Sequence, residues 1–370
     1  MNLAAERLNN MLRANNNRRA SNNVDKDKLK MTKPQNGPLK PVNGQVGLQL
    51  KKDALVSKPA LNSGPTESTQ IKFKRIDPLE NEIKCLDMAE DIYNYLAHHE
   101  KKYVLNEDFM EGGEPTSKMR RILVDWLVQV HARFHLLPDT LHLTVFILDR
   151  MLEKKVISKA DLQLLGISAM FVASKFEEVF LPDVYDYEFI TENTYNKKQI
   201  LAMEQTILNS LRFDLSCPSS LAFARCLSRV LSESEFNPDQ QAFYYTYNIS
   251  KCIGELALLD SIMSTVPKSH IAIAAMIIAL NVHPVDGIPP KAAASIIVKQ
   301  LGATRDEIKE AITILAQVAY KNFKQQKLVA IKSKYQSSKL GQVSNLLTDD
   351  VLDKIEVMGD SDDLDEILNV

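Results

Sequence analysis

The histidines are the first residues whose spacing could support chemistry. His131 and His135 stand four residues apart, a spacing with which one face of a helix can bind zinc. No glutamate lies between them, no third ligand is near, and Phe134 and Leu136 flank the second histidine. We therefore predict no metal site and interpret the two histidines as a partly buried structural pair.

The remaining histidines and the cysteines form no recognisable catalytic arrangement. The chain has 7 His and 4 Cys, without a nucleophile and base at a familiar spacing and without a glycine-rich phosphate loop. No CxxC pair occurs, so we interpret the cysteines as reduced core thiols of a cytosolic or nuclear protein. The sequence thus predicts a protein that is not an enzyme and holds no cofactor. The cysteines are Cys85, Cys217, Cys226 and Cys252.

Charge and hydropathy argue against nucleic acid and membrane as partners. The net charge is −2, but residues 1–80 hold 15 Lys and Arg against 7 Asp and Glu, so that segment is near +8 and the remainder near −10. No apolar stretch reaches the roughly 18 residues that a membrane span needs. The acidic remainder lacks the basic face of a nucleic-acid-binding repeat.

Two charged residues lie inside strongly apolar helical patterns. Arg120 and Asp149 each interrupt such a pattern, and a charge buried there requires a partner. We predict a structural ion pair between adjacent helices.

The helix expected over residues 117–135 carries two apolar stripes. A surface helix needs only one such stripe, so this helix is either buried on most sides or exposes an adhesive face. Periodicity alone favours burial and leaves both readings open. One stripe holds Met119, Ile122, Leu123 and Trp126, and the other holds Val124, Leu127, Val128 and His131.

A lysine stands beside apolar residues in a segment that is repeated later. Val172, Lys175 and Phe176 fall together at i, i+3 and i+4. An isolated lysine there would usually extend its ammonium to water. The equivalent helix of the second repeat carries Asn281 instead, so the bundle can be built without the lysine. This comparison favours a contact with a partner.

Helical periodicity positions all these residues. It runs from Pro78 to about residue 330 with short interruptions, and strand-like alternation is nearly absent, so the predicted fold is all-α. Capping patterns mark several boundaries, among them Thr304 with Glu307. The expected helices are 82–99, 117–135, 139–153, 159–177, 184–190, 195–212, 219–231, 238–259, 268–282, 289–300 and 304–323.

An internal repeat divides the helical part into two similar domains. Residues 166–175 align with residues 272–281, and each segment suits the central helix of a five-helix bundle. Residues 1–72 contain no aromatic side chain and are expected to be disordered, while the acidic end is expected to be a solvated tail. The expected parts are a disordered regulatory region 1–77, an N-terminal helix and linker 78–116, domains 117–216 and 217–335, and a C-terminal tail 336–370.

These segments resemble the cyclin family. Residues 119–128 (MRRILVDWLV) and 173–178 (ASKFEE) look like the signature of the cyclin box, and Met203-Glu204 continues it in register. Residues 129–137 and 332–339 are similar to the corresponding segments of mitotic B-type cyclins. The resemblance spans about residues 85–335 and implies two tandem cyclin-box domains.

The resemblance also implies a partner, a cyclin-dependent kinase of the mitotic type. In the family, the lysine and glutamate that match Lys175 and Glu204 bind main-chain groups of the kinase near its C-helix. Docking moves that helix so that the kinase's own Lys–Glu ion pair forms. The chain would thus activate the kinase at the G2/M transition and in mitosis. The apolar positions implied in this contact are Val172, Phe176, Leu208, Phe213 and Leu215.

A second surface implied by the resemblance is a groove for substrates with basic-plus-leucine docking motifs. Gln129 replaces the acid that some relatives carry, so we expect weaker binding of an incoming Arg or Lys. The matching residues are Met119, Ile122, Leu123, Trp126, Leu162, Gln129 and Gln163.

Family membership further implies timed destruction through a ubiquitin ligase, the anaphase-promoting complex, and shuttling between nucleus and cytoplasm. No Arg-x-x-Leu motif and no Lys-Glu-Asn triplet occurs in residues 1–80, so the degron is unidentified. The alternative function is that of a transcription-factor-like tandem repeat protein binding nucleic acid and polymerase. That class normally carries a zinc ribbon ahead of its repeats, and no cysteine pair stands there.

Overall fold

A computed structural model describes residues 89–233, 238–301, 304–325, 327–360, 364 and 368. The expected start of the first helix, Cys85 and the N-terminal regulatory region lie outside these residues. The described part is helical without strands, apart from a single bridge between Val285 and Ile288, and the all-α prediction is confirmed.

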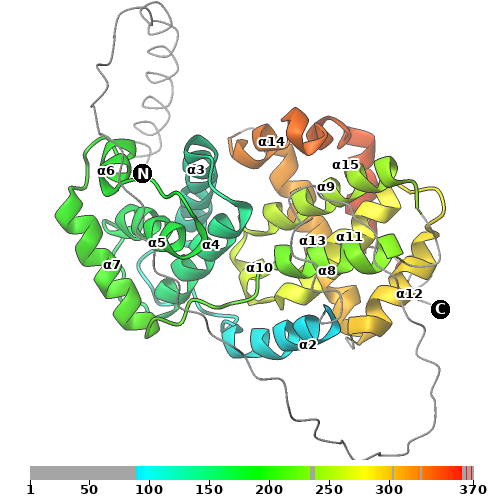
Figure 1. Cartoon of the computed structure of the whole chain (residues 1–370), viewed down its shortest axis with the longest axis horizontal. Coiled ribbons are helices and arrows are strands. Elements are labelled where there is room, and N and C mark those ends of the chain that lie inside the picture. The colour runs from blue at the N-terminus through cyan, green and yellow to red at the C-terminus, as the bar shows by residue number, and fades with distance from the viewer. Residues whose placement is uncertain are drawn as a thin grey trace, which may run out of the picture. The chain divides into compact units, whose positions relative to one another are not determined.

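Two helical bundles follow a short N-terminal helix (Figure 1). Helix α2 precedes them. The first bundle comprises α3 to α7, and the second comprises α8 to α13. The bounds are α2 Ala89–Glu100, α3 Ser117–Phe134, α4 Pro138–Glu153, α5 Leu162–Glu177, α6 Val184–Ile190, α7 Lys197–Leu211, α8 Ser220–Glu233, α9 Gln240–Ala257, α10 Ser261–Thr265, α11 Lys268–Val282, α12 Pro290–Leu301 and α13 Arg305–Lys324.

Local sequence signals explain where several helices begin. The Thr116 hydroxyl caps α3 by accepting a hydrogen bond from the backbone N–H of Met119. Asn196 with Gln199 forms a capping box at α7, and the predicted box of Thr304 with Glu307 opens α13. The helix expected from residue 159 begins later, at Leu162, because Ser158 and Asp161 hydrogen-bond to each other in a turn before α5.

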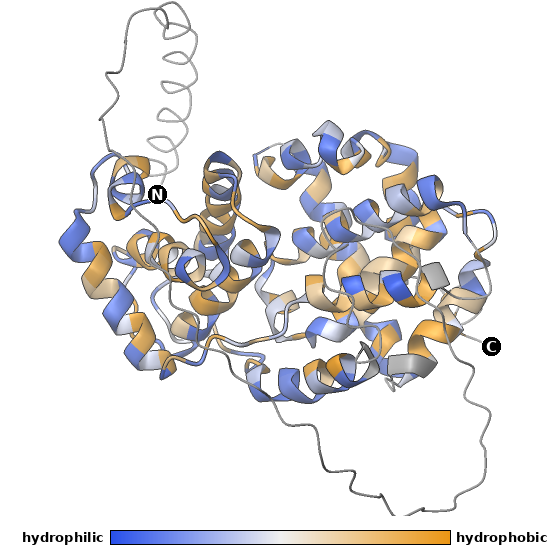
Figure 2. Ribbon diagram, viewed as in Figure 1, coloured by the Kyte–Doolittle hydropathy of each residue, from blue (hydrophilic) through white to orange (hydrophobic). Residues whose placement is uncertain are grey.

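The repeated segments form the central helix of each bundle. Helix α5 contacts α3, α4 and α7, while α11 contacts α8, α9, α12 and α13. Both helices are buried along most of their length, because apolar and small residues occupy nearly every position. Each bundle thus buries its most apolar helix beneath amphipathic neighbours, such as α7, along which polar and apolar residues alternate (Figure 2).

The acidic end is not a solvated tail throughout. Helix α15 (Asp349–Asp360) contacts α13, and Leu352, Ile355 and Met358 are buried along it. Their spacing gives one apolar face, which the charge count of this segment concealed. Shorter elements that we had not expected precede it, namely α14 (Ala330–Lys334), η3 (Ser338–Leu340) and η4 (Val343–Asn345), and η2 (Lys101–Tyr103) follows α2.

Arg120 and Asp149 form a fully buried ion pair that also joins the two bundles. The guanidinium donates to both carboxylate oxygens of Asp149, with Nε–Oδ1 and Nη2–Oδ2 distances of 2.6 and 2.7 Å. It also donates to the backbone oxygen of Leu258 and to the Ser264 hydroxyl, both at 2.9 Å. Since Leu258 and Ser264 belong to the second bundle, one guanidinium satisfies groups on both sides of the interface.

Substituting Asp149→Asn should lower the free energy of unfolding by about 3–5 kcal/mol, because it leaves a buried guanidinium without its counter-charge. Urea unfolding of the purified chain measures this. The control is Asp353→Asn, which breaks the exposed pair with Lys324 and should leave the free energy of unfolding nearly unchanged, because solvent screens that pair. Similar losses for both variants would contradict a special role for the buried pair.

Candidate functional site

The two charges expected at the kinase surface lie side by side. Lys175, in the last turn of α5, places its ammonium 2.7 Å from a carboxylate oxygen of Glu204 on α7. The same ammonium lies 4.1 Å from the centre of the Phe171 ring. The lysine is exposed and the glutamate half-buried, so both remain accessible from solvent on the first bundle.

The five apolar residues expected beside this pair divide into two groups. Phe176 and Phe213 are 55% and 68% exposed, and Leu208 is half-buried. Val172 and Leu215 are buried within the described chain and can support the surface only from beneath. The surface available to a partner therefore consists of two phenylalanines, a leucine edge and the ion pair.

A strained turn orients Phe213. Arg212 and Phe213 have φ values of 54° and 58°, in the left-handed region that side chains other than glycine occupy at a cost of about 1–2 kcal/mol each. The backbone N–H of Phe213 donates to the carbonyl of Leu208 at 2.9 Å, which closes the end of α7. Next in the chain, Asp214 accepts hydrogen bonds from Lys102 and Tyr103, and these hold the turn against the N-terminal segment.

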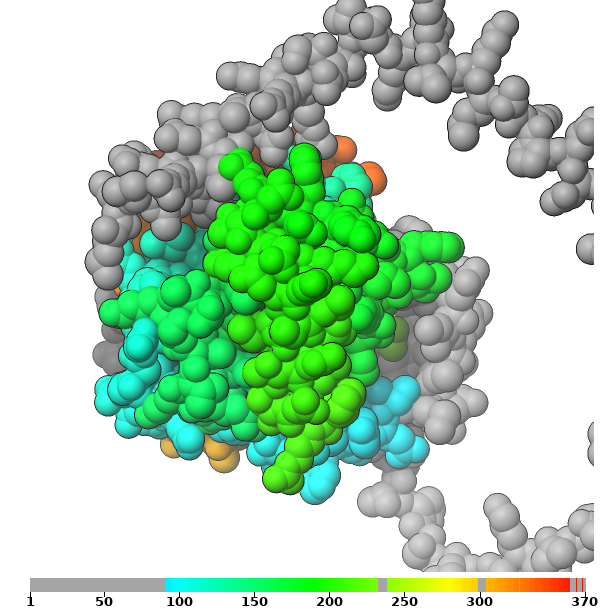
Figure 3. Space-filling model, turned by 90° about the vertical axis from the view of Figure 1, so that its left-hand side faces the viewer, coloured from blue at the N-terminus to red at the C-terminus, as the bar shows by residue number. Residues whose placement is uncertain are grey.

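Exposed apolar residues that sequence reasoning did not assign continue this surface. Val179, Phe180 and Leu181 follow the end of α5, and Phe180 is 92% exposed. Helix α6 adds Tyr185 and Phe189, both exposed, and α6 and α7 cover the face shown in Figure 3. The sequence signal was an apolar run without helical periodicity directly after the Lys175 segment.

The expected docking groove is partly open and partly core. Met119, Ile122, Gln129 and Gln163 are half-buried, while Leu123, Trp126 and Leu162 are buried. The other apolar stripe of α3 is fully buried. Of the two readings of this helix, burial therefore holds for the second stripe. Trp126 is only 3% exposed, so it can support the groove only from beneath.

A close helix contact forms the floor of this groove. A Cβ added at Gly166 of α5 would lie 2.9 Å from both terminal methyl carbons of Leu123 on α3. No side chain fits there without a shift, so the glycine lets the start of α5 approach the apolar stripe of α3. This approach brings Leu162 and Gln163 to the same helix pair as Trp126.

The two histidines do not form the expected structural pair. His131 is buried, its Nε2 donates to the carbonyl of Leu137 at 2.9 Å, and burial lowers its pKa to about 4. His135 is exposed because the helix ends there with a left-handed φ of 56°. The pair interpretation was wrong for His135. Among the described residues, no group of His, Cys, Asp and Glu is placed to hold a metal ion.

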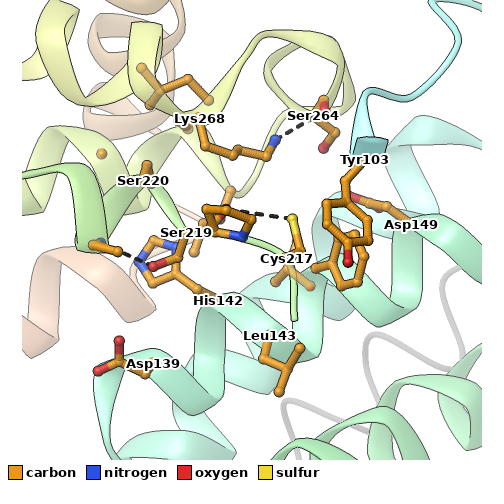
Figure 4. Close-up of a pocket in the computed structure, with 18 of the residues that line it drawn as sticks. Tyr103, Asp139, His142, Leu143, Asp149, Cys217, Ser219, Ser220, Ser264 and Lys268 are labelled. Atoms are coloured by element: carbon orange, nitrogen blue, oxygen red, sulfur yellow. Dashed lines mark hydrogen bonds between the residues drawn. The ribbon is translucent and has the colours of Figure 1, made fainter. Parts of the chain in front are cut away.

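A cavity of about 270 Å³ lies where the bundles and the N-terminal segment meet (Figure 4). Lys268 directs its ammonium to the carbonyl of Ser264 at 3.0 Å. Burial raises the pKa of Cys217 to about 12 and lowers that of His142 to about 4, so the thiol is protonated and the imidazole neutral at pH 7. A protonated thiol is a poor nucleophile, and this cavity offers no catalytic arrangement.

Comparison with known proteins identifies the family. The model of the cyclin N-terminal domain matches residues 91–216, and that of the cyclin C-terminal domain matches residues 218–349. This chain belongs to the cyclin family. In a viral cyclin from herpesvirus saimiri, 96% of the chain superimposes on 62% of this one, with a TM-score of 0.53 and 19% identity, which supports the same fold. The predicted pair of tandem cyclin domains is thereby confirmed.

Comparison with curated relatives confirms the resemblance to B-type cyclins. It is 72% identical to the G2/mitotic-specific cyclin-B1 of Caenorhabditis elegans over 96% of this chain and 99% of that one. It is 40% identical to the G2/mitotic-specific cyclin-B2 of Oryzias luzonensis over 70% of this chain and 64% of that one. These matches favour the kinase-regulator prediction over the transcription-factor-like alternative.

Within the described residues no helix is long and apolar enough to cross a bilayer.

If the expected groove binds docking peptides, substituting Gly166→Ala should weaken that binding about tenfold, because the new methyl forces the Leu123 side chain out of its present position. Overpacking costs about 1–3 kcal/mol, and the better helix propensity of alanine returns up to about 1 kcal/mol. Fluorescence anisotropy with a labelled docking peptide measures the affinity. Gly254→Ala is the control, since a Cβ there meets nothing within 4 Å. Unchanged peptide affinity in Gly166→Ala would show that this floor does not shape the groove.

Proposed function

We propose that this cyclin binds and activates a mitotic cyclin-dependent kinase at the G2/M transition and contributes substrate docking. The observation that carries the proposal is the accessible Lys175–Glu204 pair, flanked by the exposed rings of Phe176 and Phe213. An ion pair beside exposed aromatic rings contributes little to the stability of its own bundle. The identity with a mitotic cyclin-B1 supports the same partner.

The geometry supports activation through selection of one kinase conformation. Phe176, Leu208 and Phe213 supply apolar contacts for the C-helix of the kinase, while Lys175 and Glu204 supply one donor and one acceptor for main-chain groups. If the kinase C-helix can contact both the apolar residues and the charged pair only in its inward position, binding stabilises that position. The kinase then completes its own Lys–Glu pair and carries out phosphoryl transfer, and the cyclin takes no chemical part.

The ion pair of the free chain prepares the two charged side chains for this contact. Lys175 is held by Glu204 at 2.7 Å and by the ring of Phe171 beneath it, so its side chain is already ordered. Ordering a lysine on binding otherwise costs up to about 2 kcal/mol of rotamer entropy. The exposed run of Val179, Phe180 and Leu181 extends the same surface and offers further apolar area to the kinase.

Replacing Lys175→Ala together with Glu204→Ala should abolish kinase binding and activation, while the melting temperature changes by only a few degrees because a surface ion pair contributes less than about 1 kcal/mol. Calorimetric titration with the kinase and a histone-type kinase assay measure the effect. The matched control, Lys324→Ala with Asp353→Ala, removes another surface pair and should bind normally. Retained binding by the first double variant would refute the contact assignment.

Substrate docking would use the open part of the α3 stripe. Met119 and Ile122 are half-buried and form the accessible apolar rim, whereas Trp126 and Leu123 lie deeper and support it. A leucine side chain from a docking motif gains about 25 cal/mol for each Å² of apolar surface that it buries here. The groove would therefore raise the local concentration of substrates that carry such a motif.

Met119→Ala with Ile122→Ala should reduce phosphorylation of motif-bearing substrates about tenfold, whereas a short peptide substrate without the motif is phosphorylated at the same rate. The half-buried pair suits this test, since truncating the buried Trp126 would cost about 3–5 kcal/mol of stability. The ratio of kcat/KM for the two substrates gives the readout. Ile262→Ala, at an exposed isoleucine of the second bundle, is the control. An equal loss of kcat/KM on both substrates would show that Met119 and Ile122 support the hydrophobic core rather than a docking surface.

Turnover and location complete the proposal. A mitotic cyclin must be removed for its kinase to lose activity, so we include timed destruction through the anaphase-promoting ubiquitin ligase. Shuttling between nucleus and cytoplasm would bring the complex to its substrates. Both parts rest on family membership.

A further inference from the structure

The amide of Gln129 at the groove rim is fixed by a carboxylate one turn earlier on α3. Its Nε2 donates to Oδ2 of Asp125 at 3.0 Å. The other oxygen of Asp125 accepts from the backbone N–H of Ala330, the first residue of α14, also at 3.0 Å. Both carboxylate oxygens therefore have a donor, and Asp125 itself is buried.

A carboxylate accepts hydrogen bonds and donates none, so the orientation of the Gln129 amide follows from chemistry. The nitrogen must face Asp125, and the carbonyl oxygen Oε1 must point away from it. Oε1 accepts no hydrogen bond from any residue of the described chain. The half-buried glutamine thus presents an unused acceptor at the rim.

Among the described residues, no cationic side chain forms an ion pair with the Asp125 carboxylate behind this amide. Burial raises the pKa of Asp125, and the hydrogen bonds from Ala330 and Gln129 oppose that rise. A carboxylate that accepts from one end of an amide polarises the carbonyl at the other end and makes it a better acceptor. A donor that approaches Oε1 therefore meets a polarised neutral group rather than a bare carboxylate.

We propose that Asp125 is a positioning residue of the docking groove: it holds Gln129 with Oε1 outward, so that the groove selects a hydrogen-bond donor at the basic position of a docking segment. The proposal rests on the docking role given above and assigns its polar specificity. Gln129 makes the contact, and Asp125 acts only through Gln129. Lysine or arginine would be bound through a neutral amide, without the strong salt dependence of a direct ion pair.

Asp125→Asn tests this because it preserves every hydrogen bond but reverses the amide. The asparagine oxygen keeps the bond from Ala330, so its NH₂ group faces Gln129. Gln129 must then turn its own oxygen inward and present its NH₂ group at the rim. The groove of this variant should prefer an acceptor where the wild-type groove prefers a donor.

The experiment measures anisotropy of three labelled docking peptides that differ only at the basic position: lysine, norleucine or glutamate. Wild type should bind the lysine peptide about tenfold more tightly than the norleucine peptide, the worth of one charge-assisted hydrogen bond. Asp125→Asn should remove that advantage and favour the glutamate peptide over norleucine. Asp108→Asn, at an exposed aspartate, should behave as wild type.

A double-substitution cycle separates positioning from direct contact. Gln129→Ala should lose most of the discrimination, and adding Asp125→Asn to it should change nothing further. An equal effect of Asp125→Asn with and without Gln129 would overturn the proposal, because the carboxylate would then act directly. Unchanged preference in Asp125→Asn alone would overturn it as well.

A second measurement does not depend on the folding of Asp125→Asn. Gln129→Glu places a full charge at the rim, so its affinity for the lysine peptide should fall steeply between 50 and 500 mM salt, while the wild-type affinity falls less. Equal salt dependence would refute the neutral-amide contact. If wild type binds none of the peptides, the docking role fails and this inference with it, whereas kinase activation, assayed on a motif-free peptide, stands separately.

Discussion

The buried guanidinium of Arg120 is the interaction on which the arrangement of the two bundles depends. Its three donor nitrogens bond to Asp149 within the first bundle and to Leu258 and Ser264 in the second. Burying such a charge is unfavourable unless every donor is satisfied in good geometry. Because the acceptors come from both bundles, the charge is fully compensated only when the bundles are docked, so it specifies their arrangement more than it adds stability.

Helix α3 connects this interface to the functional surfaces. On one face, Val124, Leu127 and Val128 fill the core, and on another Met119 and Ile122 form the groove rim. From the same helix, Arg120 reaches α10 and Asp125 reaches α14, both in the second half of the chain. A single helix therefore carries core, interface and groove, which explains why it shows two apolar stripes together with two buried charges.

Periodicity and capping predicted most helices, the internal repeat and the Arg120–Asp149 pair. They could not predict α15, because nine acidic residues outweighed the spacing of Leu352, Ile355 and Met358. Periodicity and capping also could not separate buried site residues from accessible ones. Val172 and Leu215 are as apolar as Phe176 and Phe213 and lie in the same segments. Only the packing of neighbouring helices covers the first two. The Asp125 carboxylate that orients the Gln129 amide is held by the backbone N–H of Ala330, about 200 residues away, and no local pattern contains that contact.

The kinase surface and the groove differ in how much of their geometry exists before binding. At the kinase surface, the left-handed turn at Arg212 and Phe213 is a local strain that Asp214, anchored by Tyr103 at 2.5 Å, helps to maintain. A helix docking there meets side chains already in place, so less of the contact energy is lost to ordering. In the expected groove, three of the seven residues are covered by their own bundle and the other four are half-buried. In the proposed function, the groove would therefore contribute discrimination among substrates, while tight association would come from the kinase surface.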